Sequence, residues 1–161
     1  MSTHPEHILQ LQAYWRSLAA GRAPARQQID PTAIKELLPY LLLAGFEETP
    51  FRVRFRLTGT IVDQMTGMNI TGRYLDEFAA GIYKTPVLQL QAHYRQVWET
   101  GQPIIDTYHW PVSDHYFLDV SYGLFPLLIG DTVGQCLAIE DYGVLTFNSQ
   151  IIDWSVPLKE K

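Results

Sequence analysis

The amino-acid sequence predicts an α+β domain built on an antiparallel sheet. Three observations support this prediction: the length, the grouping of the patterns along the chain, and one strictly alternating segment. The 161 residues, 47% of them hydrophobic, suit one domain and are too few for two of ordinary size. Strand patterns come in two blocks separated by helical patterns, whereas a parallel sheet requires strands and helices to alternate. Residues 51–58 alternate between apolar and polar side chains, as in a strand with one buried face.

The first predicted element is an amphipathic helix over about residues 5–20, ended by Gly21. Four large apolar residues recur there at three- and four-residue steps and share one face: Ile8, Leu11, Trp15 and Leu18. Residues 21–28 contain Gly and Pro without apolar periodicity and are interpreted as a surface linker. The apolar stripe must pack on its own domain or on a partner.

A second, shorter helix is predicted from Asp30-Pro31 through Leu38. Asp accepts hydrogen bonds from free amides of a first turn, and Pro at the first helical position sacrifices no hydrogen bond. The short apolar run over residues 40–46 is typical of a strand. The alternating segment 51–58 follows after a turn, so the two strands are predicted to form a hairpin in which every odd position, Leu57 included, faces the core.

Short, irregular helices are predicted for residues 59–77, with Gly67 and Gly72 as breaks and Asn69 and Thr71 as capping residues. A longer helix over about residues 85–99 is predicted from apolar side chains at helical spacing and ends at Gly101. Its apolar face consists of Val87, Leu90, Tyr94 and Val97, widened by Trp98.

Three further strands are predicted over residues 103–110, 115–127 and 132–142. Residues 111–114 and 130–131 are expected to form the turns between them. The tail after Tyr142 is polar and aromatic and is expected to be irregular.

Composition excludes several classes of function. The net charge of −5 gives a field that repels phosphate backbones, so nucleic-acid binding is not expected. The single cysteine rules out an internal disulfide, and no Cys/His spacing suits a structural zinc site. With no signal-peptide pattern and no apolar run long enough for a membrane span, the chain is expected to be cytoplasmic and unanchored.

Several short motifs follow one another in an order that resembles the PAS domain, in particular short bacterial PAS-like proteins with an added N-terminal helix. These motifs are Tyr14-Trp15 before Gly21-Arg22, residues 29–31 before residues 37–39, residues 55–60 (FRLTGT) and residues 70–76 (ITGRYLD). The resemblance covers about residues 14–142. It divides the chain into an N-terminal helical extension (1–38), a PAS-like domain (39–145) and a C-terminal tail (146–161).

The resemblance implies a five-stranded antiparallel sheet of order 2-1-5-4-3 that cups the helices around a cavity. Members of the family hold haem, flavin or small metabolites there, although no motif in this chain specifies haem or flavin. A sensory or protein-interaction module is therefore expected, with its signal leaving through a partner chain or a homodimer interface. The family often dimerises through an N-terminal helix, which favours a homodimer here.

Seven residues are predicted to bound the cavity because they fall on elements that surround it in the family: Phe55, Met65, Met68, Tyr74, Tyr94, Trp98 and Tyr108. Many of them would equally serve as ordinary core, since large aromatic residues dominate burial in a domain of this size. An apolar pocket with a few phenol or imidazole hydrogen bonds would suit an aromatic or lipid-like molecule.

Other chemistry-bearing residues are interpreted as structural. His93, placed where some haem-binding relatives have a ligand, is expected to face solvent or a hydrogen-bond partner. His109 and His115 beside Asp114 could hold a metal only if the strand register placed them on one face. Ser113-Asp114-His115 cannot form a triad, because consecutive residues of an extended chain point to opposite sides.

Cys136 in an apolar strand is expected to be core, and the asparagine–cysteine motif of light-sensing flavin relatives is missing. The stripe of Arg52, Arg54 and Arg56 is expected to face water or pair with carboxylates.

Two competing functions stay open. One is a small isomerase or dehydratase on a cone-shaped α+β fold, with a pocket built from Asp106, Tyr108, His109 and Asp119. The other is a PAS fold with a filled core that serves only as a docking scaffold.

Overall fold

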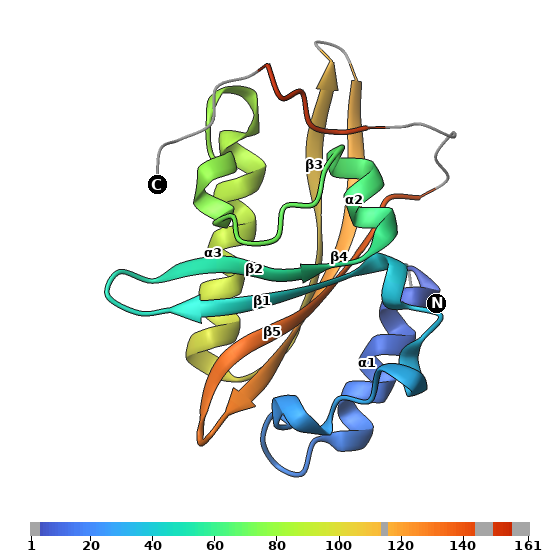
Figure 1. Cartoon of the computed structure of the whole chain (residues 1–161), viewed down its shortest axis with the longest axis vertical. Helices are drawn as coiled ribbons and strands as arrows, with labels where there is room; N and C mark the ends of the chain where they lie inside the picture. The colour runs from blue at the N-terminus through green and yellow to red at the C-terminus, as the bar shows by residue number, and fades with distance from the viewer. Residues whose placement is uncertain (1–3, 114–115, 144–149, 156–161) are drawn as a thin grey trace.

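The computed structural model describes residues 4–113, 116–143 and 150–155 and contains one five-stranded antiparallel sheet with helices on both faces (Figure 1). The strands are β1 (Leu41–Glu47), β2 (Arg52–Thr58), β3 (Ile104–Ser113), β4 (Tyr116–Ile129) and β5 (Thr132–Asp141). Their order across the sheet is β2-β1-β5-β4-β3, and every neighbouring pair is antiparallel. Both the predicted α+β class and the strand order implied by the resemblance are confirmed.

The inner face of the sheet is covered by α3 (Lys84–Thr100), α2 (Thr60–Thr66) and two 3-10 helices, η4 (Leu75–Phe78) and η5 (Gly81–Tyr83). The long helix predicted from apolar periodicity is thus confirmed, with Val87, Leu90, Tyr94 and Val97 of its predicted face buried and Trp98 half-buried. The expectation of short, irregular helices between β2 and α3 is also confirmed.

The outer face of the sheet is covered in part by α1 (Glu6–Leu18), which crosses β4 and β5 (Figure 1). Ile8, Leu11 and Trp15 are buried there, and Trp15 Nε1 donates to the carbonyl oxygen of Pro126 on β4 at 2.8 Å. Helix α1 can approach β4 closely because Gly123 has no side chain. A Cβ at this position would lie 3.0 Å from Ile8 Cγ2. The predicted stripe therefore packs on its own domain.

The segment between α1 and β1 differs from the prediction in two ways. The expected surface linker is tied to the sheet, since the Leu128 amide donates to the carbonyl of Pro24 at 2.9 Å. The expected helix over residues 31–38 is replaced by two 3-10 turns, η2 (Pro31–Ile34) and η3 (Leu38–Tyr40). Ile34 and Leu37 are both buried, and side chains three residues apart eclipse one another in the tighter 3-10 geometry.

The predicted alternation of β2 holds only as far as Phe55. Leu43 pairs with Leu57 but Ala44 pairs with Phe55, so Arg56 is an extra residue, a β-bulge. A bulge reverses the facing of the residues beyond it. Leu57 is consequently 62% exposed on the outer face, and its predicted place in the core is wrong.

The hairpin between β3 and β4 begins later than predicted. β3 continues through Pro111 to Ser113, where a turn was expected, and Pro111 pairs with Phe117. Proline is tolerated because β3 is an edge strand, which need not donate on its open side. Asp114 and His115 lie outside the described residues, so the predicted Ser113-Asp114-His115 arrangement has no structural description.

Two hydrophobic clusters lie on the opposite faces of the sheet, one under α2 and α3 and the other under α1 and residues 23–41. Residues 124–128 of β4 form a continuous apolar run because both faces are covered at this point. The predicted division at residues 38 and 145 stays a prediction. None of the helices in the described part of the chain is long and apolar enough to span a membrane.

Candidate functional site

A buried carboxylate occupies the inner face of the central strand β5. Period-2 alternation places Cys136, Ala138 and Glu140 on the face that packs under the helices, and Tyr142, just beyond the strand, continues this row. Glu140 is only 9% exposed although it is acidic. A buried carboxyl group is costly unless it is hydrogen-bonded, so its partners define the site.

Two tyrosine hydroxyls donate to this carboxylate. Tyr108 on β3 donates to Oε2 of Glu140, and Tyr142 donates to Oε1 at 3.3 Å. Burial raises the pKa of Glu140 above its ordinary value, and the hydrogen bonds from the two tyrosines oppose this rise. Burial also holds the pKa of both tyrosines well above the ordinary value, so they remain donors.

Aromatic rings form the wall of the site on the side of β3. Trp110 stacks on Tyr83 with ring centroids 4.5 Å apart and meets Tyr108 edge-on at 5.8 Å. Tyr108 in turn lies 5.5 Å from the ring of Tyr122. Burial raises the pKa of Tyr122 to about 12.

The space beside Glu140 is small, about 50 Å³. It is lined from the sheet by Leu42, Phe55, Tyr108, Trp110, Glu140 and Tyr142. The helical layer supplies Thr66, Ile70, Leu75, Phe78, Val87 and Leu90, and the C-terminal segment adds Ile151 and Ile152. Pockets that bind small molecules are usually about 300–1,000 Å³, so this form of the cavity is too small for a metabolite.

Residues 150–155 return to the inner side of the domain, where Ile151 and Ile152 line the cavity. The Ile151 amide donates to Met65 O at 2.7 Å, and Trp110 Nε1 donates to Ile151 O at 2.5 Å. Trp154 Nε1 donates to Thr66 O at 2.7 Å. Residues 150–155, the described part of the tail, are irregular as expected of the tail, but they pack against the domain, which the sequence analysis did not anticipate.

Four of the seven predicted cavity residues lie in the inner cluster. Phe55 and Tyr108 line the cavity itself, whereas Met65 and Tyr94 are buried beside it without lining it. Their role toward a ligand stays a prediction.

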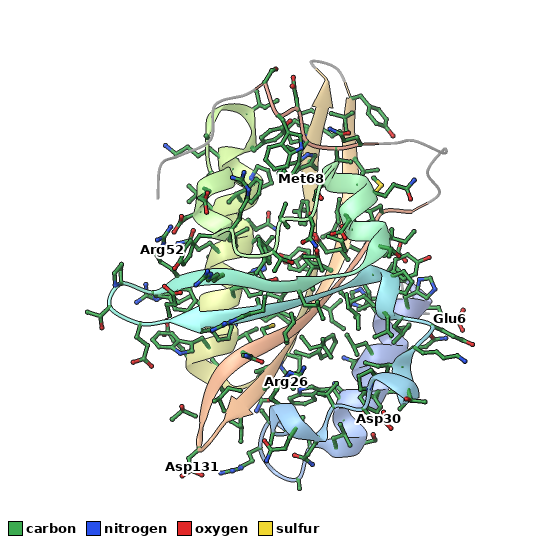
Figure 2. All side chains as sticks on the ribbon, in the orientation of Figure 1. Glu6, Arg26, Asp30, Arg52, Met68 and Asp131 are labelled. Carbon is green, nitrogen blue, oxygen red and sulfur yellow. The ribbon has the colours of Figure 1, made fainter. Side chains whose placement is uncertain are left out.

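The other three predicted residues lie away from the cavity. Met68 follows α2 at the surface and is 41% exposed (Figure 2). The ring of Tyr74 lies 3.5 Å below the guanidinium of Arg52, and its hydroxyl donates to Glu47 at 2.8 Å. Trp98 is half-buried near Phe51, with ring centroids 4.9 Å apart.

The residues of the enzyme alternative do not converge. Tyr108 points inward, whereas His109 and Asp119 are exposed and hydrogen-bond to each other at 2.5 Å. Asp106 is half-exposed, and its Oδ2 lies 3.8 Å from His93 Nε2. The pocket predicted for an isomerase or dehydratase is therefore not formed by these four residues.

The geometry of His93 and of Cys136 agrees with the roles interpreted for these two residues from the sequence. His93 Nδ1 hydrogen-bonds to Tyr122 Oη at 2.5 Å, and His93 does not line the cavity. Cys136 is fully buried, and burial raises the pKa of its thiol far above the range of a reactive cysteine. Within the described residues, no three His, Cys, Asp or Glu side chains are grouped so that they could hold a metal.

The arginine stripe is partly paired. Arg52 binds both carboxylate oxygens of Asp76 at 2.7 Å, as the sequence interpretation expected for at least part of the stripe. Arg54 lies 5.7 Å from the ring centroid of Tyr74, and Arg56 lies along Gly45.

The sequence analysis missed Glu140, Tyr142, Trp110 and the two C-terminal isoleucines. Alternation along β5 could have identified Glu140, because it shares a face with Cys136 and Ala138 in an otherwise apolar strand. Nothing local indicates that Ile151 and Ile152 return to the cavity.

An antiparallel sheet of order 2-1-5-4-3 under a long helix, with a polar group aimed into a small inner cavity, defines a class of small α+β domains in which one sheet cups a helical layer. A sequence profile of the PAS domain matches residues 3–127, and the chain belongs to this family. No curated protein sequence matches the chain.

Among solved structures, a fungal LOV domain photoreceptor is similar, with a TM-score of 0.50 and 11% sequence identity over 83% of this chain and 90% of that one. At this identity the likeness concerns the fold.

Proposed function

We propose that this PAS domain senses a small, mostly apolar molecule that carries one hydrogen-bond donor. The observation that carries the proposal is the buried carboxylate of Glu140, which lines an otherwise largely apolar cavity. A polar group held in an apolar pocket fixes the orientation of a ligand and gives it specificity. A donor such as a ring N–H would replace one of the tyrosine hydroxyls on Glu140.

The C-terminal segment is the occupant that such a ligand would displace. Ile151 and Ile152 fill the end of the cavity, and only about 50 Å³ is left beside them. A ligand that binds the open form shifts the population of the segment from packed to released. The released segment would then signal to a partner chain or to a second copy in a homodimer, in a cytoplasmic setting.

The proposal predicts that weakening the segment tightens ligand binding. Trp154→Phe removes the N–H donor to Thr66 O, so releasing residues 150–155 from the domain costs less free energy. If the cost falls by about 1 kcal/mol, the apparent affinity for the ligand should rise about fivefold. Trp15→Phe is the matched control, because it removes an equivalent indole–carbonyl bond on the opposite face of the sheet. It should lower stability without changing affinity.

The experiment starts with native mass spectrometry and an absorption spectrum of the freshly purified protein, which reveal any retained molecule. Indole then serves as a probe with one N–H donor, and indene as the same shape without it. Titration calorimetry should show indole binding that Trp154→Phe strengthens and Glu140→Gln weakens. If indole and indene bind equally, or if Trp154→Phe and Trp15→Phe change affinity alike, the proposal is wrong.

A docking scaffold with a filled core is the second candidate, and the small volume left in the cavity favours it. A protein that retains no molecule and binds neither probe, even after Trp154→Phe, would be assigned to this function.

A further inference from the structure

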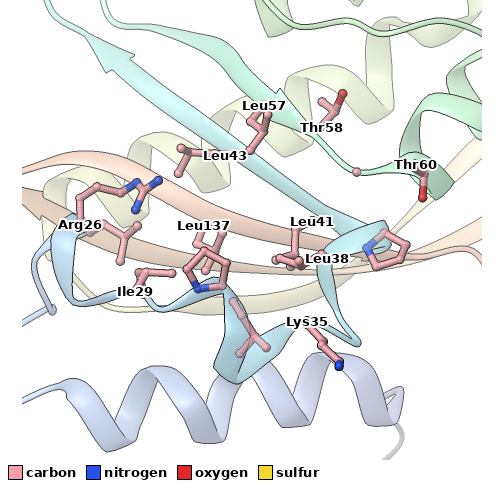
Figure 3. Close-up of a pocket in the computed structure, with 15 residues that line it drawn as sticks. Arg26, Ile29, Lys35, Leu38, Leu41, Leu43, Leu57, Thr58, Thr60 and Leu137 are labelled. Atoms are coloured by element: carbon pink, nitrogen blue, oxygen red, sulfur yellow. The ribbon is translucent and has the colours of Figure 1, made fainter.

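A second hollow lies on the outer face of the sheet and is separate from the cavity beside Glu140. Its volume is about 450 Å³, within the range of small-molecule sites, and it runs between the sheet and residues 26–39 (Figure 3). Its apolar lining is entirely aliphatic and includes Ile29, Leu38, Leu41, Leu43, Leu57 and Leu137. We call this hollow the outer groove.

The bulge in β2 builds one wall of the outer groove. Because Arg56 is the extra residue, Leu57 turns outward and stands opposite Leu43 on the adjacent strand. With 62% of its surface exposed, Leu57 stabilises the folded chain little in this position. Bulges recur where a side chain must be re-aimed toward a site, and an outward leucine here extends the apolar wall.

Charge in the outer groove has one sign. Arg26 and Lys35 line it, and no Asp or Glu does so, although the whole chain carries −5. Figure 3 shows Arg26 at one end and Thr60 at the other, with leucines between them. The Arg26 guanidinium has no carboxylate partner among the described residues.

We propose that the outer groove binds an aliphatic monocarboxylate, a free fatty acid, with its carboxylate on Arg26 and its chain along the leucines. A guanidinium binds a carboxylate through two parallel hydrogen bonds, and no residue that the structure describes engages this donor pair of Arg26. The aliphatic lining offers no ring for aromatic stacking, and the few threonines are too sparse for a sugar phosphate. The site is distinct from the proposed sensory cavity, so either can fail alone.

The test is titration calorimetry with dodecanoate below its critical micelle concentration, in a buffer of low ionic strength that contains no detergent. Wild type should bind one dodecanoate per chain. Arg26→Gln should lower the affinity about tenfold, the effect of losing a charge-assisted pair. Dodecanol should bind wild type as weakly as dodecanoate binds Arg26→Gln. Leu57→Ser should weaken the binding of both dodecanoate and dodecanol. Because Leu57 is exposed, this substitution should not unfold the chain.

Arg16→Gln is the matched control, since Arg16 is exposed on α1 outside the groove, and Glu140→Gln tests independence from the inner cavity. Both should bind dodecanoate like wild type. Three results would overturn the proposal: no dodecanoate binding, equal affinity of wild type and Arg26→Gln, or binding to phosphatidylglycerol vesicles without binding of the free acid. Concentration-dependent dimers in ultracentrifugation that Leu57→Ser abolishes would instead assign the groove to a second copy.

Discussion

At the scale of single residues, Glu140 is a buried carboxyl group of the inner core, and its titration links pH to stability. Its folded-state pKa is raised from the ordinary value of 4.5 by burial, so the folded chain binds the proton more tightly than the unfolded chain. The contribution of Glu140 protonation to the stability of the folded chain is therefore complete below the ordinary pKa. It is lost as the pH rises through the raised, folded-state pKa.

Glu140→Gln is therefore expected to match wild type in stability at acidic pH and to exceed it increasingly as pH rises above about 4.5. The difference should grow by at most about 1.4 kcal/mol per pH unit and level off beyond the folded-state pKa. Urea unfolding at a series of pH values measures it. A difference that stays constant with pH would show that the carboxyl group titrates alike in both states.

The bulge in β2 makes a second prediction at this scale, from two residues on one strand. Phe55→Ala removes a buried ring and should cost about 3–5 kcal/mol in the free energy of unfolding. Leu57→Ala, two residues further, should change it by no more than about 0.5 kcal/mol, because the side chain is exposed. Urea denaturation of both variants checks this, and similar losses would mean that β2 alternates without a bulge.

At the scale of elements, the sequence predicted what depends on local patterns. Apolar spacing located α1 and α3, whereas the facing of β5 was not predicted, although alternation along that strand would have placed Glu140 inward. A bulge leaves no mark in the pattern of β2, since FRVRFRLT reads as regular alternation whichever residue is extra. The packing of residues 150–155 depends on contacts with distant Met65 and Trp110, which no local pattern encodes.

The docking of α1 on the sheet depends on the missing side chain of Gly123. A Cβ there would lie 2.7 Å from Phe125 Cε2 and 3.0 Å from Ile8 Cγ2, so Gly123→Ala should cost about 1–3 kcal/mol. Gly45→Ala is a matched control on β1, because the new methyl group meets only the flexible side chain of Arg56. Thermal unfolding of the two variants should separate them, and equal melting temperatures would argue against this close approach.

At the scale of the whole molecule, the sheet separates two hydrophobic clusters that are expected to loosen independently. Ile151→Ala with Ile152→Ala thins only the inner cluster, at a cost of about 2 kcal/mol or more per site. If residues 150–155 open as a local unit, amide exchange in α2 should accelerate by about thirtyfold per 2 kcal/mol while exchange in α1 stays unchanged. Leu11→Ala, on the outer face, should accelerate amide exchange in α1 and leave exchange in α2 unchanged. Hydrogen exchange followed by mass spectrometry reads both helices in one experiment. Equal acceleration of α1 and α2 in either variant would mean that the two faces unfold together, and the C-terminal segment could not then respond to a ligand while the outer groove keeps its shape.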